Sequence, residues 1–166
     1  IMDTALEDIP AAVSRGAVEF GIGPDRPCDA GVERRFFRKV AIQFVCSSAH
    51  PAARKRSIRW SDTQDDPWIC YPSTFEKDIR EALWRHGRTQ RMEDATVVEH
   101  LPTALALVGQ GLGVTTAPDY ARALRRDLKL SFIPLVEPAI ERAFYIYQRN
   151  GHPLSPAARG FLDELM

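Results

Sequence analysis

The clearest pattern of apolar and polar positions lies in residues 96–118. Four apolar residues recur there at i, i+3, i+4 and i+7, the spacing of one helix face: Leu101, Ala104, Leu105 and Val108. Pro102 suits the first turn of this helix, and Gly111 can adopt the left-handed conformation just past its end. Residues 112–116 are apolar and β-branched, which predicts a buried strand. Strand, helix and strand without a hairpin turn predict a parallel sheet.

Apolar runs and turn signals along the rest of the chain predict strands that alternate with helices. Further helices are predicted at residues 8–15, 73–87, 119–126 and 155–165. Further strands are predicted at residues 17–22, 40–46, 68–71, 94–98, 128–135 and 143–148. Asp8 and Ser155 are placed to cap the first and the last of these helices. This order of elements indicates the α/β class.

Composition narrows the classes of protein that fit. The 166 residues suit one domain or two small lobes, and 45% hydrophobic residues are enough for a core. The 22 basic and 22 acidic side chains cancel, which argues against this chain being the nucleic-acid-binding part of a protein. No apolar run approaches the roughly 18 residues of a membrane span, and no signal peptide is visible. We therefore expect a cytoplasmic protein.

The three cysteines and the known catalytic motifs add little chemistry. Cys28, Cys46 and Cys70 are odd in number and widely spaced, so they form neither a disulfide framework nor a zinc pattern. No Walker loop, dinucleotide fingerprint, paired metal-binding histidines or catalytic triad motif is present. We predict no enzyme, no catalytic residue, no metal and no cofactor. His50 precedes a proline in a loop, and we interpret it as a solvated surface residue rather than a base.

The sequence resembles the effector-binding domain of LysR-type transcriptional regulators. Residues 99–118, Glu-His-Leu-Pro-Thr-Ala-Leu-Ala-Leu-Val-Gly-Gln-Gly-Leu-Gly-Val-Thr-Thr-Ala-Pro, match the family's Ala- and Leu-rich helix, Gly-x-Gly turn, apolar strand and proline. Residues 13–23, 145–149 and 154–161 resemble further family segments, with Glu19 where aspartate is usual. The resemblance covers residues 13–165.

This resemblance implies a two-lobed, periplasmic-binding-protein-like (type II) fold. Lobe I would comprise residues 1–41 and 148–166, and lobe II residues 42–147. A small-molecule effector would bind in the cleft between the lobes, and the full-length protein would be a dimer or tetramer that binds DNA through an N-terminal helix-turn-helix. Family members also begin their effector domain with another strand–helix–strand unit. We therefore expect lobe I to be incomplete in this sequence.

The helix that opens at Ser73 is the best candidate for a binding site. Its free N–H groups and partial positive charge suit a carboxylate, and Ser73 and Thr74 add hydroxyl groups. In the family the corresponding residues contact the effector; the alternative is that they only cap the helix. Tyr71 and Phe75 are candidates for an aromatic wall.

Three further residues are weaker candidates for the same site. Glu99 and His100 open the next helix and are equally well explained as solvated caps, and Gly23 would lie on the lobe I side. Two other functions stay open. One is a transporter's solute-binding protein of similar fold. The other is a thiol redox sensor that uses Cys70 and Cys46. The competing interpretation is that both cysteines are small, buried hydrophobic residues.

Trp84 is predicted to point away from the core. It lies about half a turn round the helix from the apolar face set by Phe75, Ile79 and Leu83. An outward tryptophan is often an interface anchor, and the resemblance implies that this helix and residues 91–98 join two effector domains. The alternative is that residues 54–66 fold over Trp84 within one chain.

Overall fold

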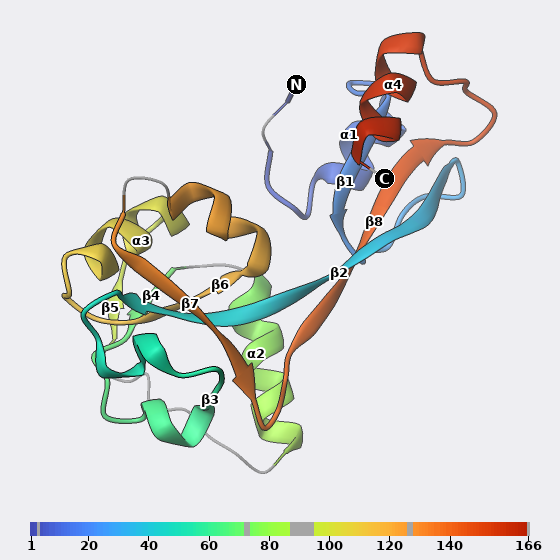
Figure 1. Ribbon diagram of the computed structural model, residues 1–166. Helices are drawn as coiled ribbons and strands as arrows, with labels where there is room; N and C mark the ends of the chain where they lie inside the picture. Colours follow the sequence, from blue (N-terminus) through green and yellow to red (C-terminus); the bar gives the residue numbers. More distant parts are fainter. Residues whose placement is uncertain (3, 72–73, 87–94, 126–127, 166) are drawn as a thin grey trace. The chain divides into compact units, whose positions relative to one another are not determined.

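The computed structural model describes the chain except residues 3, 72–73, 87–94, 126–127 and 166 (Figure 1). Two compact units are formed. Unit 1 comprises Ile1–Val40 and Arg142–Met166, and unit 2 comprises Ala41–Glu141. Two long strands, β2 (Val32–Ser47) and β8 (Glu141–Arg149), begin in one unit and end in the other. The α/β class predicted from the sequence is confirmed.

Unit 1 is built on antiparallel strands. β1 (Phe20–Pro24) pairs with β8, so that Gly21 lies opposite Tyr147. α1 (Ile9–Ser14) packs on this pair, and its residues Ile9 and Val13 form a small core with Val32 and Tyr147. Of these four side chains only that of Tyr147 has a polar atom, its hydroxyl. This hydroxyl donates to the Pro24 carbonyl over 2.6 Å and accepts from the Arg26 N–H over 2.8 Å.

The last helix of unit 1, α4 (Pro156–Leu165), begins at a double cap. The Ser155 hydroxyl accepts from the Ala158 N–H over 3.2 Å, as predicted. The Glu19 carboxylate in turn accepts from both the Ser155 N–H, over 2.7 Å, and the Ser155 hydroxyl, over 2.9 Å. At α1 the expected cap is wrong, because the Asp8 side chain makes no capping hydrogen bond.

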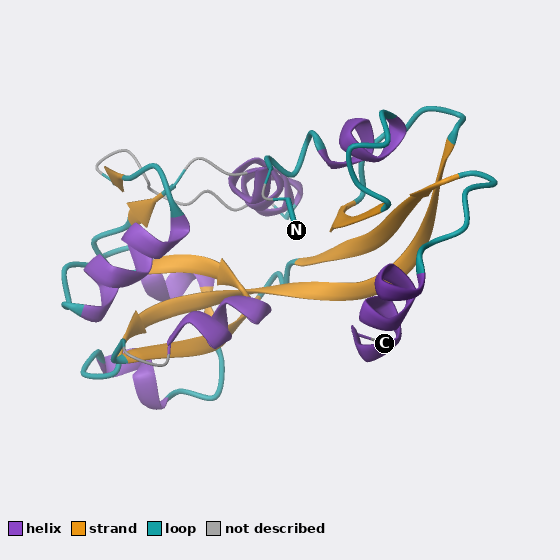
Figure 2. Cartoon of the chain, turned by 90° about the horizontal axis from the view of Figure 1, so that it is seen from above, coloured by secondary structure: helices purple, strands orange, loops and turns teal. Residues whose placement is uncertain are grey.

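Unit 2 contains two sheets with helical segments on either side (Figure 2). In one sheet β2 pairs antiparallel with β6 (Thr115–Pro118) and with β7 (Leu130–Val136), and β3 (Ile58–Arg59) runs parallel to β7. In the other, β4 (Ile69–Cys70) runs parallel to β5 (Thr96–Val97). The helical segments are α2 (Thr74–Arg85), α3 (Leu101–Gly109) and the 3-10 helices η1 (Pro51–Arg54), η2 (Trp60–Thr63) and η3 (Asp119–Arg125).

The core of unit 2 forms around α3. Ala104, Leu105 and Val108 are fully buried there, as the spacing predicts, and they pack against Val45 and Phe132 from the larger sheet. Gly111 ends this helix with φ +77°. Its N–H donates to the Val108 carbonyl, and the Leu112 N–H donates to the Leu107 carbonyl, which is the hydrogen-bond pattern of a Schellman motif.

The parallel arrangement predicted around α3 is confirmed for the strand before it and for part of the strand after it. β4 and β5 are parallel, and Trp68 makes a parallel bridge to Val114. The strand after α3, β6, also pairs antiparallel with β2, so the pairing of this segment is mixed rather than purely parallel. The segment predicted as a helix at residues 119–126 is the 3-10 helix η3.

Candidate functional site

The carboxyl edge of β4 and β5 gathers most of the predicted site residues. The Val98 N–H donates to the Cys70 carbonyl over 2.9 Å, which holds the ends of the two strands side by side. Tyr71 follows β4 directly, whereas Glu99 and His100 follow Val98. α2 and α3 both begin just beyond this edge. In parallel sheets, ligands bind in the crevice outside the carboxyl ends of the strands.

The side chain of Tyr71 is held in place at this edge by packing and by a hydrogen bond. Its half-buried ring packs against the apolar cluster around α3. Its hydroxyl donates to the Thr116 carbonyl over 3.2 Å, which ties the end of β4 to β6. An amphipathic ring held at both its apolar and its polar end keeps one orientation before a ligand arrives.

The two residues before α3 are solvated. His100 occupies the N-cap position, but its side chain makes no capping hydrogen bond, and the Glu99 side chain is also exposed. Their position beside Tyr71 follows from the strand pairing, whereas contact with a ligand stays a prediction. Ser73 lies outside the described residues. Thr74 and Phe75 begin α2, and their side chains are likewise outside the described part of the structure.

Gly23 belongs to β1 in unit 1 and faces α1. A Cβ atom at this position would lie 2.7 Å from Cδ1 of Ile9, so the space above the glycine is already occupied by a side chain. This packing gives Gly23 a structural reason to be glycine. Its predicted role toward a ligand stays a prediction.

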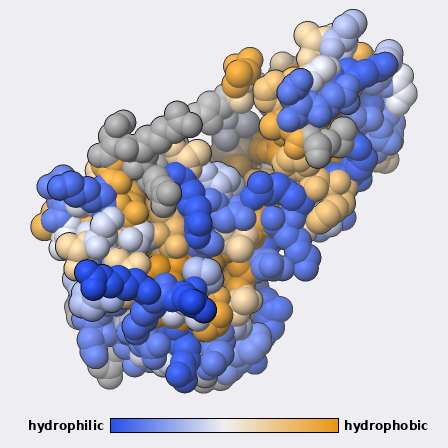
Figure 3. All heavy atoms as spheres, viewed as in Figure 1, coloured by the Kyte–Doolittle hydropathy of each residue, from blue (hydrophilic) through white to orange (hydrophobic). Residues whose placement is uncertain are grey.

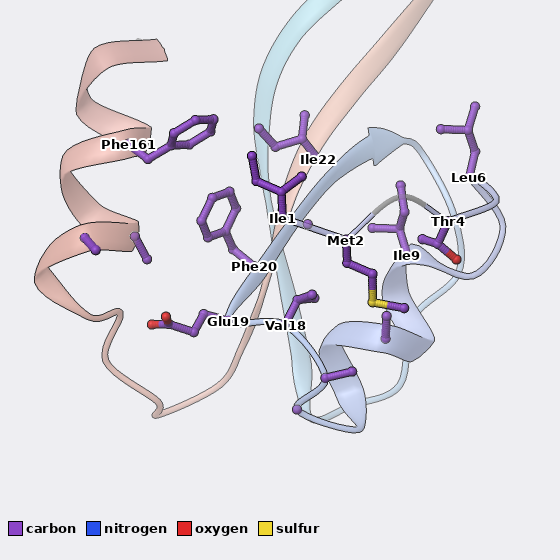
Figure 4. A pocket seen from close by; sticks show the side chains of 16 residues that line it. Ile1, Met2, Thr4, Leu6, Ile9, Val18, Glu19, Phe20, Ile22 and Phe161 are labelled. Carbon is purple, nitrogen blue, oxygen red and sulfur yellow. The ribbon is translucent and has the colours of Figure 1, made fainter.

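Unit 1 holds a cavity of about 760 Å³ that the sequence did not reveal (Figure 4). Phe20 and Ile22 of β1 form one wall, and Phe161 of α4, whose ring centroid lies 6.0 Å from that of Phe20, forms another. The helix-spaced apolar stripe of α4, formed by Ala158, Phe161, Leu162 and Leu165, is only partly buried, because Phe161 is 49% exposed and Leu165 is exposed as well. Only Ala158 and Leu162 of that stripe are buried.

The cavity has the wrong chemistry for the predicted carboxylate ligand. Its described lining contains no lysine, arginine or histidine, and its one ionisable side chain is Glu19. The Ser155 N–H, and after it the Ser155 hydroxyl, lower the pKa of Glu19 below its ordinary value of 4.5. Glu19 is therefore negatively charged at neutral pH. An apolar cavity bordered by a carboxylate disfavours an anion.

His50 is part of the structure of unit 2 rather than a solvated residue. Its Nδ1 accepts from the Ala52 N–H over 3.1 Å, so the proton lies on Nε2, which donates to the Asp66 carboxylate over 3.1 Å. The ring also packs against Phe44, with centroids 6.1 Å apart. Both ring nitrogens are engaged, and the expectation of a surface histidine is wrong.

The structure accounts for two of the three thiols, those of Cys46 and Cys28. Burial, and after it the nearby Asp66 carboxylate, raises the pKa of Cys46 to about 11, so this thiol stays protonated at neutral pH. The Cys28 thiol donates to the Val32 carbonyl over 3.4 Å. Among the described residues no group of three or more His, Cys, Asp or Glu side chains could hold a metal ion. Within the same residues no helix is long and apolar enough to span a membrane.

Comparison with known families identifies the fold and the family. Residues 2–166 match the sequence model of the LysR substrate binding domain. The chain belongs to this family. It is thus a ligand-binding domain of the regulator type and not an enzyme, as the sequence predicted.

Two curated regulators are similar to this chain. The HTH-type transcriptional regulator YbhD of Escherichia coli is 28% identical over 172 residues, covering 100% of this chain and 52% of that protein. BenM of Acinetobacter baylyi, also an HTH-type transcriptional regulator, is 24% identical over 147 residues, covering 84% of this chain and 47% of that protein. The chain therefore spans about half the length of the curated relatives it matches.

Solved structures show the same fold. The BenM effector-binding domain with its effector benzoate has a TM-score of 0.78 at 21% identity, covering 98% of this chain and 74% of that one. The QuiR effector-binding domain in complex with shikimate has a TM-score of 0.71 at 20% identity, covering 98% and 77%. The fold is the periplasmic-binding-protein-like type II fold predicted from the sequence.

Proposed function

We propose that this chain senses a small organic acid for a LysR-type transcriptional regulator, and that the acid binds at the carboxyl edge of β4 and β5. The observation that supports this most is the meeting of two helix starts, those of α2 and α3, with the fixed ring of Tyr71 at one edge of parallel strands. BenM and QuiR share the fold, and benzoate and shikimate, the ligands in their structures, are both carboxylates.

Each part of the edge supplies a different interaction. The first N–H groups of α2 lack partners within the helix and carry the positive end of its dipole, which favours a carboxylate. Ser73 and Thr74 add hydroxyl donors in this proposal, and Phe75 adds a second aromatic ring beside that of Tyr71. Glu99 and His100 then border the outer rim, where their solvated side chains accept or reject polar groups on the ligand.

The ligand would act by shifting an equilibrium in the full-length regulator. A ligand favours one arrangement of a protein only as far as it binds that arrangement more tightly than the other. We propose that the favoured arrangement is relayed to a DNA-binding domain elsewhere in the full-length protein, which forms a dimer or tetramer. The redox-sensing alternative is disfavoured for Cys46, because this thiol is fully buried and its pKa is raised to about 11.

A thermal-shift screen tests the proposed ligand chemistry. Benzoate and shikimate represent the anions, benzamide is a neutral analogue and benzylamine a cationic one. A ligand at 100 times its Kd stabilises the folded state by about 2.7 kcal/mol, which for a chain of this size raises Tm by roughly 5–10 °C. We expect this shift with one or more carboxylates and with neither of the other two.

Three variants locate the binding site. Ser73→Ala and Thr74→Val remove the proposed hydroxyl donors and should weaken carboxylate binding about tenfold each, the loss of one hydrogen bond to a charged group. Ser48→Ala removes an exposed hydroxyl elsewhere in unit 2 and serves as the matched control. The proposal fails if benzylamine is the best ligand, or if both variants bind carboxylates as tightly as the parent chain does.

A further inference from the structure

A dense group of cationic residues occurs in one short segment of unit 2. Four of the six residues from 54 to 59, named here the basic segment, are cationic and exposed: Arg54, Lys55, Arg56 and Arg59. The segment joins η1 to β3, and hydrophilic side chains predominate over the lower part of unit 2 in the view of Figure 3. The net charge of zero for the whole chain is therefore unevenly distributed, because the basic segment has four cationic residues and no acidic one.

The backbone beneath these charges is held in place. Ala52, Ile58 and Trp60 are buried around the segment, with Trp60 only 1% exposed. The indole N–H of Trp60 donates to the Pro138 carbonyl over 2.9 Å, and β3 pairs with β7. The four cationic side chains thus extend from a fixed base, which lowers the conformational entropy lost when they bind a partner.

The positive charge is not neutralised within the described part of the chain. None of the four side chains forms an ion pair with a described carboxylate. Of the three acidic residues that follow, Asp66 accepts from His50 and Asp62 accepts from the Ser61 hydroxyl over 3.5 Å, whereas Asp65 is exposed. Charges on an edge strand also prevent unwanted strand pairing, but Arg59 alone lies in β3, so that role leaves three cations unexplained.

We propose that the basic segment binds the phosphate backbone of duplex DNA. Six residues of extended chain span at most about 20 Å, and the same length of duplex carries roughly 12 phosphates. Three of the four cations are arginines, whose planar guanidinium matches phosphate oxygens in a two-pronged geometry. The curated relatives are HTH-type transcriptional regulators, so duplex DNA is the polyanion that the full-length protein meets.

The proposed contact is independent of DNA sequence and weak. It rests on the family of the chain and not on the proposed ligand edge, so either can fail without the other. Four phosphate contacts predict that log K falls with log salt concentration at a slope of about −3.6. Such a contact would add to the affinity of a separate DNA-binding domain without selecting the target site.

Fluorescence anisotropy of the 166-residue chain with a fluorescein-labelled 20-base-pair duplex tests the proposal. KCl is varied from 20 to 150 mM, and the expected slope is about −3.6. The double variant Arg54→Ala/Arg56→Ala should reduce the slope by about two and lower the affinity at 20 mM KCl roughly tenfold or more. The control Arg15→Ala/Arg159→Ala removes the same charge from exposed positions of unit 1 and should leave the slope unchanged.

Three results would overturn the assignment. The first is no saturable binding at 20 mM KCl. The second is an equal loss of salt dependence in the control variant, which would show that binding depends on the net charge of the chain and not on the basic segment. The third is displacement of the duplex by poly-glutamate at the same charge concentration, which would identify an acidic protein as the partner. Circular dichroism of each variant separates a lost contact from a lost fold.

Discussion

Gly111 and Gly113 belong to one Gly-Leu-Gly turn, yet the structure gives them different reasons to be glycine. Gly111 has φ +77° and open space around it, so its conformation alone demands glycine. Gly113 has no positive φ, but a Cβ there would overlap the Pro67 carbonyl oxygen and lie 3.1 Å from Cγ1 of Ile69. Substitutions at these two positions should therefore destabilise the fold by different mechanisms, and different second substitutions should restore the stability.

The magnitudes follow from these two mechanisms. Gly111→Ala forces an alanine into the left-handed region and should lower the free energy of unfolding by about 1–2 kcal/mol. Gly113→Ala overpacks a close approach, at about 1–3 kcal/mol. It also displaces the acceptor of the 2.9 Å hydrogen bond from the Val114 N–H to the Pro67 carbonyl, which adds about 1 kcal/mol. We expect a total loss of about 2–4 kcal/mol at Gly113.

Urea unfolding followed by tryptophan fluorescence measures both losses. Asparagine tolerates the left-handed conformation, so Gly111→Asn should recover most of the stability that Gly111→Ala loses. Gly113→Asn should be no better than Gly113→Ala, because any side chain meets the same carbonyl. The reasoning is refuted if asparagine rescues both positions equally, or if Gly113→Ala unfolds within about 0.5 kcal/mol of the parent chain.

Three other predictions concern separate groups. Hydrogen bonds from Ser155 lower the pKa of Glu19, so the contribution of this carboxylate to the free energy of unfolding is fully present above pH 4.5 and is lost as the pH falls below it. The difference in free energy of unfolding between the parent chain and Glu19→Gln should therefore be constant from pH 7 to 5 and shrink below pH 4.5. With a pKa of about 11, Cys46 should not react with a disulfide reagent at pH 8 in a Cys28→Ser/Cys70→Ser variant until urea unfolds it, so fast reaction would contradict its burial. Trp84 is 77% exposed, so Trp84→Glu should change the stability of this chain by less than about 0.5 kcal/mol, while lowering the sedimentation coefficient of the full-length regulator if the tryptophan anchors an interface.

The outward direction of Trp84 shows what local sequence can predict. Helix periodicity alone separated Trp84 from Ile79 and Leu83, which are 4% and 2% exposed. The alternative in which residues 54–66 cover Trp84 is wrong, because a covered side chain would not be 77% exposed. Its role in an interface stays a prediction, since a periodic pattern gives direction and not partner.

Elements that depend on distant partners were predicted less well. The first half of β2 reads Glu-Arg-Arg-Phe-Phe-Arg-Lys, and its charges hide a strand that forms because β8, more than 100 residues later, pairs beside it. The cavity of unit 1 was missed for the same reason. The periodicity of α4 placed Phe161 on its apolar face, but no sequence pattern says whether another element covers that face.

The residues that identify the family are not the residues proposed to bind the ligand, and this limits what the relatives reveal. In the segment that carries the resemblance, Ala104, Leu105 and Val108 fill the core, whereas Gly111 and Gly113 shape the turn. These positions are determined by packing, which any member of the fold must satisfy whatever it binds. The proposed ligand contacts are the helix starts and the side chains around them, where Glu99 and His100 are solvated and under no packing constraint. A solvated rim can change without affecting the core, so benzoate or shikimate in a relative indicates a ligand class for this chain and not a ligand.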